Sequence, residues 1–312
     1  MSAVTMDGDF GTKKPVDRNR CSLPVIEVVT EPAKEIKMEK VATLPAGEIG
    51  TPFAEKLANL GRAILPPVLG MVILLGIWYI ATMKGGSIPG PIKTWDAATV
   101  LFADPFYRNG PNDQGIGWNI LSSLQRVGIG FGFAALVGIP LGFILGRSPF
   151  LSAMINPIIS LLRPVSPLAW LPIGLLVFQK ADPAATYTIF ICSIWPMIMN
   201  TAQGVQRVPQ DYLNVARVLA LSEWKVVTKI LFPAVLPYML TGIRLSIGTA
   251  WLVIVAAEML TGGVGIGFWV WDEWNNLKVE HIIIAIFVIG IVGLILEQAL
   301  ILLAKKLTKE SA

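Results

Sequence analysis

The chain of 312 residues is too apolar for an ordinary soluble domain, because 54% of its residues are hydrophobic, 15% are charged, and its mean hydropathy is +0.64. It carries 25 basic and 21 acidic residues, and in a membrane protein this excess of basic residues reports orientation rather than a nucleic-acid partner. Cys21 and Cys192 lie in a polar segment and in an apolar run, so we expect neither a disulfide nor a metal site.

The first 61 residues are predicted to form a tail outside the membrane domain. They are mixed in charge, contain prolines and show no sustained helical periodicity. They also lack the basic start, short apolar stretch and small-residue cleavage site of a signal peptide, so we expect the first apolar run to stay attached. Residues 1–61 should therefore be partly disordered, with an interfacial helix near Phe53–Leu60.

Six apolar runs predict six membrane-spanning helices, since about 20 residues at ~1.5 Å each cross a hydrocarbon core of about 30 Å. The runs are 64–83, 127–146, 149–178, 184–206, 232–260 and 281–304. The third run is interrupted by Arg163, Pro164, Pro167 and Pro172. We therefore expect a short helix followed by a kinked span there.

The second run contains glycines at four-residue steps. They are Gly128 and Gly132, followed by Gly138, Gly142 and Gly146. Small residues on one face of a helix allow the backbone of a neighbouring helix to approach closely. The pattern therefore predicts a helix-packing face.

Basic residues near the span ends set the orientation. With six spans, one side receives Arg62, Arg147, Arg207, Arg217, Lys225, Lys229, Lys305, Lys306 and Lys309. The other side has fewer basic residues and holds the Gly- and Pro-rich loop over residues 84–117. The basic side should be cytoplasmic, so we expect a multi-pass protein of the inner membrane with both termini inside.

The segment between the fourth and fifth runs, residues 207–233, is too polar to cross a membrane and too apolar for a bare linker. It is predicted to form a rigid helix, turn and helix on the cytoplasmic side. The expected elements are a helix over Gln210–Leu219, a turn at Ala220 and Leu221, an N-cap at Ser222, and a helix over Glu223–Leu231 that Pro233 ends.

This loop resembles that of the permeases of binding-protein-dependent importers, which reads Glu-Ala-Ala, three residues, Gly, nine residues, Ile, one residue, Leu-Pro. The spacing is kept without a gap: Asn214 to Ala216 stand at the first three positions, Ala220 at the glycine, and Ile230, Phe232 and Pro233 at the last three. The resemblance implies that the loop couples the membrane helices to a partner ATPase. The residues assigned to this role are Asp211, Asn214, Ala216, Arg217, Ala220, Ser222, Glu223 and Lys225.

Three further stretches are similar to the nitrate, bicarbonate and cyanate branch of these permeases. They are DPFYRNGPNDQGIGW from Asp104, RPVSPLAWLPIGLLVF from Arg163, and AEMLTGGVGIGFWVWDEWNNL from Ala257. The likeness covers residues from about 62 to 306 and is greatest to nitrate permeases. It implies import of nitrate, and also of nitrite, with bicarbonate or cyanate as the alternative substrate.

The resemblance also implies a fold and an assembly. The fold is all-α, with six transmembrane helices in the MetI-like arrangement of type I ATP-binding-cassette (ABC) importers. Its parts are the tail 1–61, the permease domain 62–306 with the coupling loop 207–233, and a cytoplasmic tail 307–312. The implied partners are a second copy of the chain, two cytoplasmic ABC ATPases that differ in the nitrate systems, an external nitrate-binding protein and membrane lipid. ATP and Mg would be bound by the ATPases, and this non-catalytic chain would bind no cofactor.

Charges inside the membrane are costly, so each one suggests a role. Arg163 and Arg244 are candidates for an anion pathway; the alternatives are an interhelical ion pair for Arg163 and snorkelling to the headgroups for Arg244. Glu258 would repel an anion, so pairing or gating is expected. Further pathway candidates are Asn200, Thr201, Ser246 and Thr249, whose side chains could instead bond to helix backbone.

Two other classes of protein remain as alternatives. An ion-gradient-driven secondary transporter is suggested by the broken third run, but it would need titratable residues deep in several spans. A membrane enzyme would need a nucleophile and base or a metal motif, and the sequence contains neither HExxH nor a phosphate-loop motif. We therefore expect no catalytic residues and no metal site in this chain.

Overall fold

The computed structural model describes residues 52–86 and 88–310, and within these residues every named element is a helix. The chain divides into two units, Met1–Arg62 and Ala63–Ala312. Helix α1 (Pro52–Thr82) begins in the first unit and includes the segment predicted as an interfacial helix. The tail predicted over residues 1–51 lies outside the described residues.

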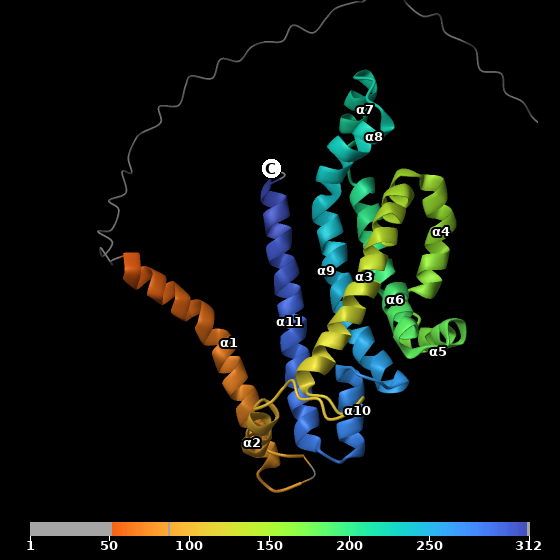
Figure 1. Cartoon of the computed structure of the whole chain (residues 1–312). Helices are drawn as coiled ribbons and strands as arrows, with labels where there is room; N and C mark the ends of the chain where they lie inside the picture. Colours follow the sequence, from red (N-terminus) through yellow and green to blue (C-terminus); the bar gives the residue numbers. More distant parts are fainter. Residues whose placement is uncertain (1–51, 87, 311–312) are drawn as a thin grey trace, which may run out of the picture. The chain divides into compact units, whose positions relative to one another are not determined.

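The second unit contains the other helices, joined mostly by short connections (Figure 1). They are α2 (Pro91–Leu101), α3 (Ile116–Arg147), α4 (Pro149–Leu162), α5 (Pro167–Phe178), α6 (Ala181–Gln206), α7 (Gln210–Val218), α8 (Glu223–Val226), the π-helical turn η1 (Val227–Leu231), α9 (Phe232–Thr261), α10 (Ile266–Asn275) and α11 (Val279–Glu310). Helices α7 and α8 lie at one end of this unit and α10 lies at the other (Figure 1). These ends are called the loop end and the α10 end below.

Among the residues that the structure describes, four stretches are long and apolar enough to cross a membrane: Ile64–Thr82, Ile116–Arg147, Glu223–Thr261 and Val279–Lys306. A fifth span follows if α4 and α5, which meet at 98°, count as one broken span, and this break falls within the third predicted run. The predicted fourth span is α6, which packs mainly against α3 and α9. Because Thr188, Ser193 and Thr201 are buried against protein, α6 can be less apolar than a lipid-facing helix. The count of six spans remains a prediction.

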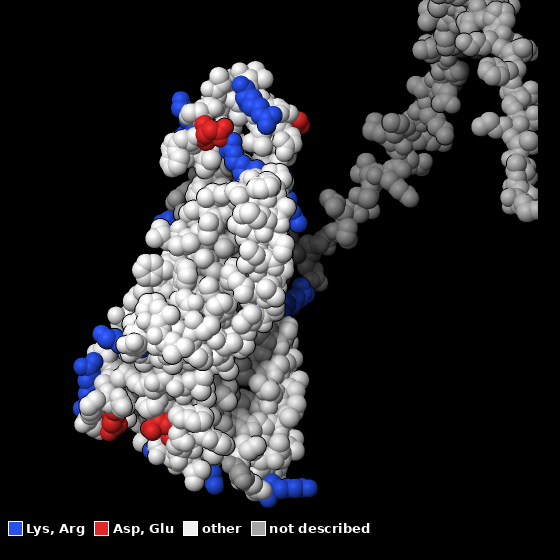
Figure 2. Space-filling view, turned by 90° about the vertical axis from the view of Figure 1, so that its right-hand side faces the viewer, with Lys and Arg blue, Asp and Glu red and all other residues white. Residues whose placement is uncertain are grey.

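The exposed surface of these helices is largely apolar. Leu136 of α3, Leu176 of α5 and Ile286 of α11 are all exposed. Figure 2 shows the charged side chains of one face gathered toward its two ends, with a broad uncharged band between them. This distribution is expected for helices surrounded by hydrocarbon, where a charge is costly.

The prediction that the glycines of α3 form one helix-packing face is correct for three of the five glycines. Gly138, Gly142 and Gly146 do contact α6, but Gly128 and Gly132 face open space. Gly132 and Gly138 are six residues apart, which places them about 120° apart around a helix with 3.6 residues per turn. The contact face continues instead through Gly130, which lies against Ile189.

Replacing Gly142 with alanine should therefore destabilise the helix pair. A methyl group there would lie 2.6 Å from Thr201 Cβ and 2.8 Å from the carbonyl oxygen of Ile198. We expect Gly142→Ala to lower the free energy of unfolding by about 1–3 kcal/mol, measured by thermal unfolding of the detergent-solubilised protein. The control is Gly132→Ala, where nothing lies within 4 Å; equal destabilisation by both variants would contradict the close packing.

Candidate functional site

The candidate coupling loop, residues 207–233, begins with α7 and a left-handed turn. The amide of Leu221 donates to the carbonyl of Ala216 and the amide of Ala220 donates to that of Arg217, both at 3.0 Å. This pair of bonds is a Schellman motif, which places Ala220 at the left-handed position with φ 47°. Ala220 thus occupies a conformation that glycine adopts without strain, at the position where the related loops carry glycine.

The second half of the loop differs from the sequence prediction. Ser222 has an extended N-cap backbone, but its side chain makes no capping bond. Pro233 was expected to end the second helix, and this was wrong: α8, η1 and α9 form one helical stretch over Glu223–Thr261. The wider π turn ends at Leu231, two residues before Pro233, so the backbone bonding is already irregular where the amide hydrogen of Pro233 is missing.

Buried apolar side chains hold the loop against the membrane helices. Ala216, Val226 and Leu231 are buried and belong to one cluster with Val205 of α6 and Val235 of α9. Of the assigned coupling residues, only Ala216 faces inward in this way. The exposed ones are Asp211, Asn214, Arg217, Ala220, Ser222, Glu223 and Lys225.

The loop also exposes large apolar side chains that were not assigned a role from the sequence. Val218 is 86% exposed, Trp224 is 75% exposed, and Val215 and Leu219 are more than half exposed. Exposed apolar groups on an otherwise polar loop indicate a surface that binds protein. Their spacing on α7 was the signal in the sequence that could have revealed them.

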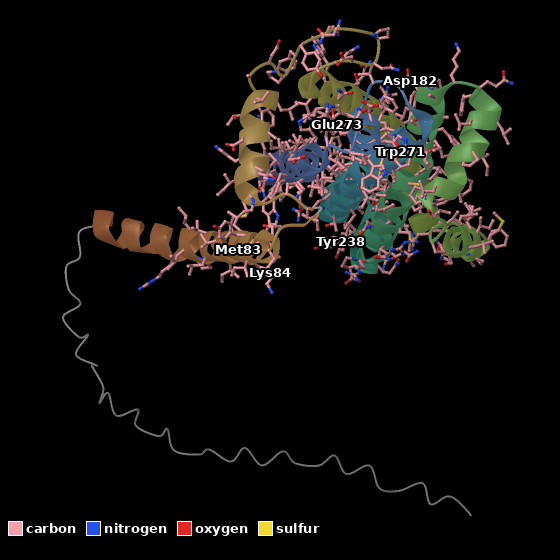
Figure 3. The ribbon with its side chains drawn as sticks, turned by 90° about the horizontal axis from the view of Figure 1, so that it is seen from below. Met83, Lys84, Asp182, Tyr238, Trp271 and Glu273 are labelled. Atoms are coloured by element: carbon pink, nitrogen blue, oxygen red, sulfur yellow. The ribbon has the colours of Figure 1, made fainter. Side chains whose placement is uncertain are left out.

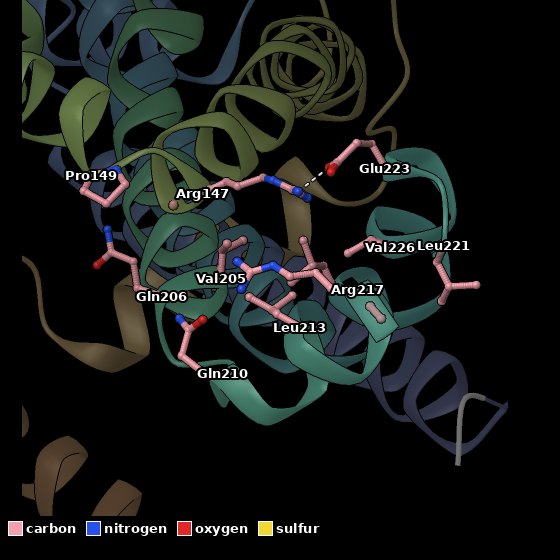
Figure 4. Close-up of a pocket in the computed structure, with 13 residues that line it drawn as sticks. Arg147, Pro149, Val205, Gln206, Gln210, Leu213, Arg217, Leu221, Glu223 and Val226 are labelled. Carbon is pink, nitrogen blue, oxygen red and sulfur yellow. Dashed lines mark hydrogen bonds and ion pairs between the residues drawn. The ribbon is translucent and has the colours of Figure 1, made fainter. Parts of the chain in front are cut away.

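A cavity of about 470 Å³ lies between this loop and the ends of α3 and α6 (Figure 4). Arg147, the last residue of α3, forms an ion pair with Glu223 of α8 across it. Arg217 donates a 3.2 Å hydrogen bond to Asn214 Oδ1 and also lines the cavity. The ion pair with Arg147 joins the loop to α3.

At the α10 end, a buried polar network surrounds Glu258, which is only 2% exposed. Its carboxylate accepts bonds from Arg126 Nη1 at 2.6 Å, from Ser123 Oγ at 2.8 Å and from the amide of Gly267 at 3.0 Å. Methyl groups at Gly265 or Gly267 would collide with this side chain or with the backbone of Val255. The structure thus pairs Glu258 with Arg126, a residue that sequence reasoning did not single out because its partner lies 132 residues away.

A second polar cluster connects α10 to α11. Glu273 lies 2.9 Å from His281 Nδ1 and 3.6 Å from Lys278 Nζ. Burial opposes ionisation of Glu273, but the hydrogen bond and charge of His281, together with Lys278, outweigh it and hold the pKa of this carboxyl below its ordinary value. Figure 3 looks onto the α10 end, with Asp182, Trp271 and Glu273 labelled.

The two arginines proposed for an anion pathway lie on different helices. Arg163 follows α4 at the bend before α5, is exposed, and contacts Met199 Sδ at 3.5 Å. Arg244 of α9 is exposed and lines a groove of about 590 Å³ between α9 and α11. The same groove contains Glu297 of α11, a charged residue that the sequence reasoning did not consider.

The four polar pathway candidates make mostly backbone contacts. Asn200 donates to the carbonyl of Pro196 at 2.8 Å, and Thr249 donates to that of Leu245 at 3.0 Å. Ser246 donates across helices to the carbonyl of Ser193 at 2.6 Å. Thr201 is fully buried beside Gly142, and its hydroxyl has no hydrogen-bond partner within the described part of the chain. Of the four, Thr249 lines the groove that contains Arg244.

Comparison with known proteins finds similarity to the membrane components of transport systems in both sequence and fold. Residues 138–309 match the family described as binding-protein-dependent transport system inner membrane component. The chain is 48% identical to a nitrate import permease protein of Synechocystis sp. over 75% of this chain and 86% of that protein. It is 46% identical to a bicarbonate transport system permease protein of the same organism over 78% and 88%. A structure of the MetNI methionine ABC transporter in inward facing conformations has the same fold, with a TM-score of 0.52 at 14% identity over 62% of this chain and 94% of that one.

The left-handed conformation of Ala220 leads to a test of the turn. Glycine at this position removes strain, whereas a β-branched residue with positive φ is strongly disfavoured. We expect Ala220→Gly to leave stability within about 1 kcal/mol of the parent and Ala220→Val to lower it by about 1–3 kcal/mol. Thermal unfolding and proteolysis of residues 210–230 measure both effects; a tolerated valine would contradict the turn geometry.

Proposed function

This chain belongs to the family of binding-protein-dependent transport system inner membrane components, as a permease subunit of an ABC importer, and we propose that it imports nitrate, with nitrite as a second substrate. The single observation behind the nitrate proposal is the 48% identity to a nitrate import permease. Bicarbonate is the competing substrate, because a bicarbonate permease is 46% identical, and cyanate is a further alternative from the same branch. Because the chain belongs to this family, we no longer retain the alternative of an ion-gradient-driven secondary transporter.

The permease is a multi-pass protein of the inner membrane, and we propose that its loop end faces the cytoplasm. Arg147, Arg207, Arg217 and Lys225 lie at or near this end, as positive charge on the cytoplasmic side requires. The α10 end is then external. Both chain termini are cytoplasmic in this proposal, and two copies of the chain enclose the pathway.

Importers of this family work with ATPases and an external binding protein, and the loop offers a surface for the ATPase. Trp224, Val218 and Leu219 expose apolar surface on this loop, and Asp211, Lys225 and Arg217 are exposed charged residues of the same loop. Aromatic residues in such a setting often dominate binding. We propose that two different ATPases bind here, that they hold ATP and Mg, and that the chain itself catalyses no reaction.

For the anion pathway we retain Arg244 and Arg163. Nitrate accepts hydrogen bonds but donates none, so a guanidinium with unused donors suits it. Within the described residues neither arginine forms a salt bridge, in contrast to Arg126 and Arg147. Glu297 lines the same groove and reduces the positive charge around Arg244, so the groove attracts an anion less strongly than Arg244 alone would. The hydroxyl of Thr249 already donates a hydrogen bond to the carbonyl of Leu245, so it contributes little to binding an anion in this groove.

Substrate identity is tested with the assembled importer. The permease, its ATPases and the cognate binding protein are placed in liposomes, and uptake of labelled nitrate is measured with and without ATP. We expect ATP-dependent nitrate uptake that excess nitrite inhibits and excess bicarbonate does not. Uptake of bicarbonate in place of nitrate would transfer the assignment to the competing substrate.

The pathway arginines are tested in the same liposomes. Loss of a hydrogen bond to a charged group costs about 1.5–3 kcal/mol, so we expect Arg244→Gln and Arg163→Leu each to reduce nitrate uptake about tenfold or more while ATP hydrolysis continues. Lys305→Gln, a change of charge outside the proposed pathway, is the control. Normal uptake by an assembled arginine variant removes that residue from the pathway.

A further inference from the structure

Arg126 connects α3 to three other parts of the chain at the α10 end. Its Nη1 donates to Glu258 Oε1 of α9 at 2.6 Å and to the carbonyl of Val264 at 2.7 Å. Its Nη2 lies 2.7 Å from Asp182 Oδ1 of α6, which is 73% exposed. Because these bonds use both edges of the planar guanidinium, a lysine with one ammonium group cannot reproduce them.

The loop over residues 262–267 is held in place by the same network. The amide of Gly265 donates to Asn119 Oδ1 and the amide of Ile266 donates to Ser123 Oγ, both at 2.9 Å. Ser123 also bonds to Glu258, so it contacts both the carboxylate and the first turn of α10. The position of α10 therefore depends on α3 through Asn119, Ser123 and Arg126.

At its other end α3 is attached to the candidate coupling loop. Arg147 pairs with Glu223 there, and it lies 21 residues, or about 32 Å, from Arg126 along the helix. Between the two arginines, Gly130, Gly138 and Gly142 pack tightly on α6. Because these contacts leave little free space between α3 and α6, we expect the two helices to move together, although Pro140 lies inside α3 between the two arginines.

We propose that Arg126 and Glu258 are positioning residues of the transport cycle: they fix α10 to α3, so that docking of the external binding protein at the α10 end is transmitted through α3 to the coupling loop. This rests on the proposed function, in which the α10 end is external. The exposed Trp271 and Trp274 of α10 provide the surface on which docking acts. Arg126 and Glu258 do not contact the transported anion in this role.

The test measures ATP hydrolysis by the complete complex in liposomes, with and without nitrate-loaded binding protein. In Arg126→Lys we expect the stimulation by the binding protein to fall about fivefold or more, while unstimulated hydrolysis stays within about twofold of the parent. Arg108→Lys is the control, since Arg108 lies over the Trp118 ring at the same end of the molecule and takes no part in the Glu258 network. Unchanged stimulation, or an equal loss of stimulated and unstimulated hydrolysis, overturns the proposal.

Two further experiments cover the cases in which the first one gives no answer. If Arg126→Lys does not assemble, Ser123→Ala is scored by the same ratio, because it removes only the hydroxyl between Glu258 and Ile266. If nitrate-loaded binding protein fails to stimulate the parent complex, the nitrate assignment fails, and the ratio is measured with bicarbonate-loaded protein instead. In either arm, loss of stimulation with hydrolysis retained supports the proposal, and any other result overturns it.

Discussion

The buried carboxylate of Glu258 determines the structure of the α10 end. Removing an ion from water costs several kcal/mol unless other groups pair with it and hydrogen-bond to it. Here one guanidinium, one hydroxyl and one backbone amide offset part of that cost. The amide can approach only because Gly267 has no side chain, and Gly265 makes room for the carboxyl group itself. Gly265 and Gly267 are thus explained by close contact with Glu258, whereas Gly262 and Gly263 are explained by their positive φ angles of 75° and 91°.

What could be predicted from the sequence was encoded locally. Apolar runs identified α1, α3, α9 and α11, and the spacing of the loop motif located the turn at Ala220, where the structure has its left-handed residue. Contacts between distant segments could not be predicted, since nothing near Arg126 points to Asp182 or Glu258. Pro233 was misjudged for a related reason: its effect depends on the backbone around it, and here a π-helical turn ending at Leu231 comes just before it.

The two ends of the membrane domain are built on different principles. At the loop end, Ala216, Val226 and Leu231 are buried and fix the loop from beneath, while its outer surface combines charge with exposed Trp224 and Val218. Such a surface is suited to a protein partner that covers it. At the α10 end, Ile266 and Trp269 are also buried in an apolar cluster, and the charged network around Glu258 adds bonds that have few alternative geometries. The two ends therefore differ in the burial of their ion pairs: Arg126 and Glu258 are largely buried, whereas Glu223, the partner of Arg147, is 80% exposed.

The continuous helical stretch from Glu223 to Thr261 has a mechanical consequence. Its 39 residues extend about 58 Å, nearly twice the thickness of a hydrocarbon core of about 30 Å. It therefore forms a lever that pivots at its α10 end, with about half of its length beyond a core of this thickness. A tilt of about 5° around its α10 end moves Glu223 by about 5 Å. Such a tilt barely disturbs side-chain contacts near the fulcrum, yet it displaces the coupling loop by the diameter of a helix backbone. If the loop binds an ATPase as proposed, a large movement at Glu223 produces only a small movement of the helix near Thr261, inside the membrane domain.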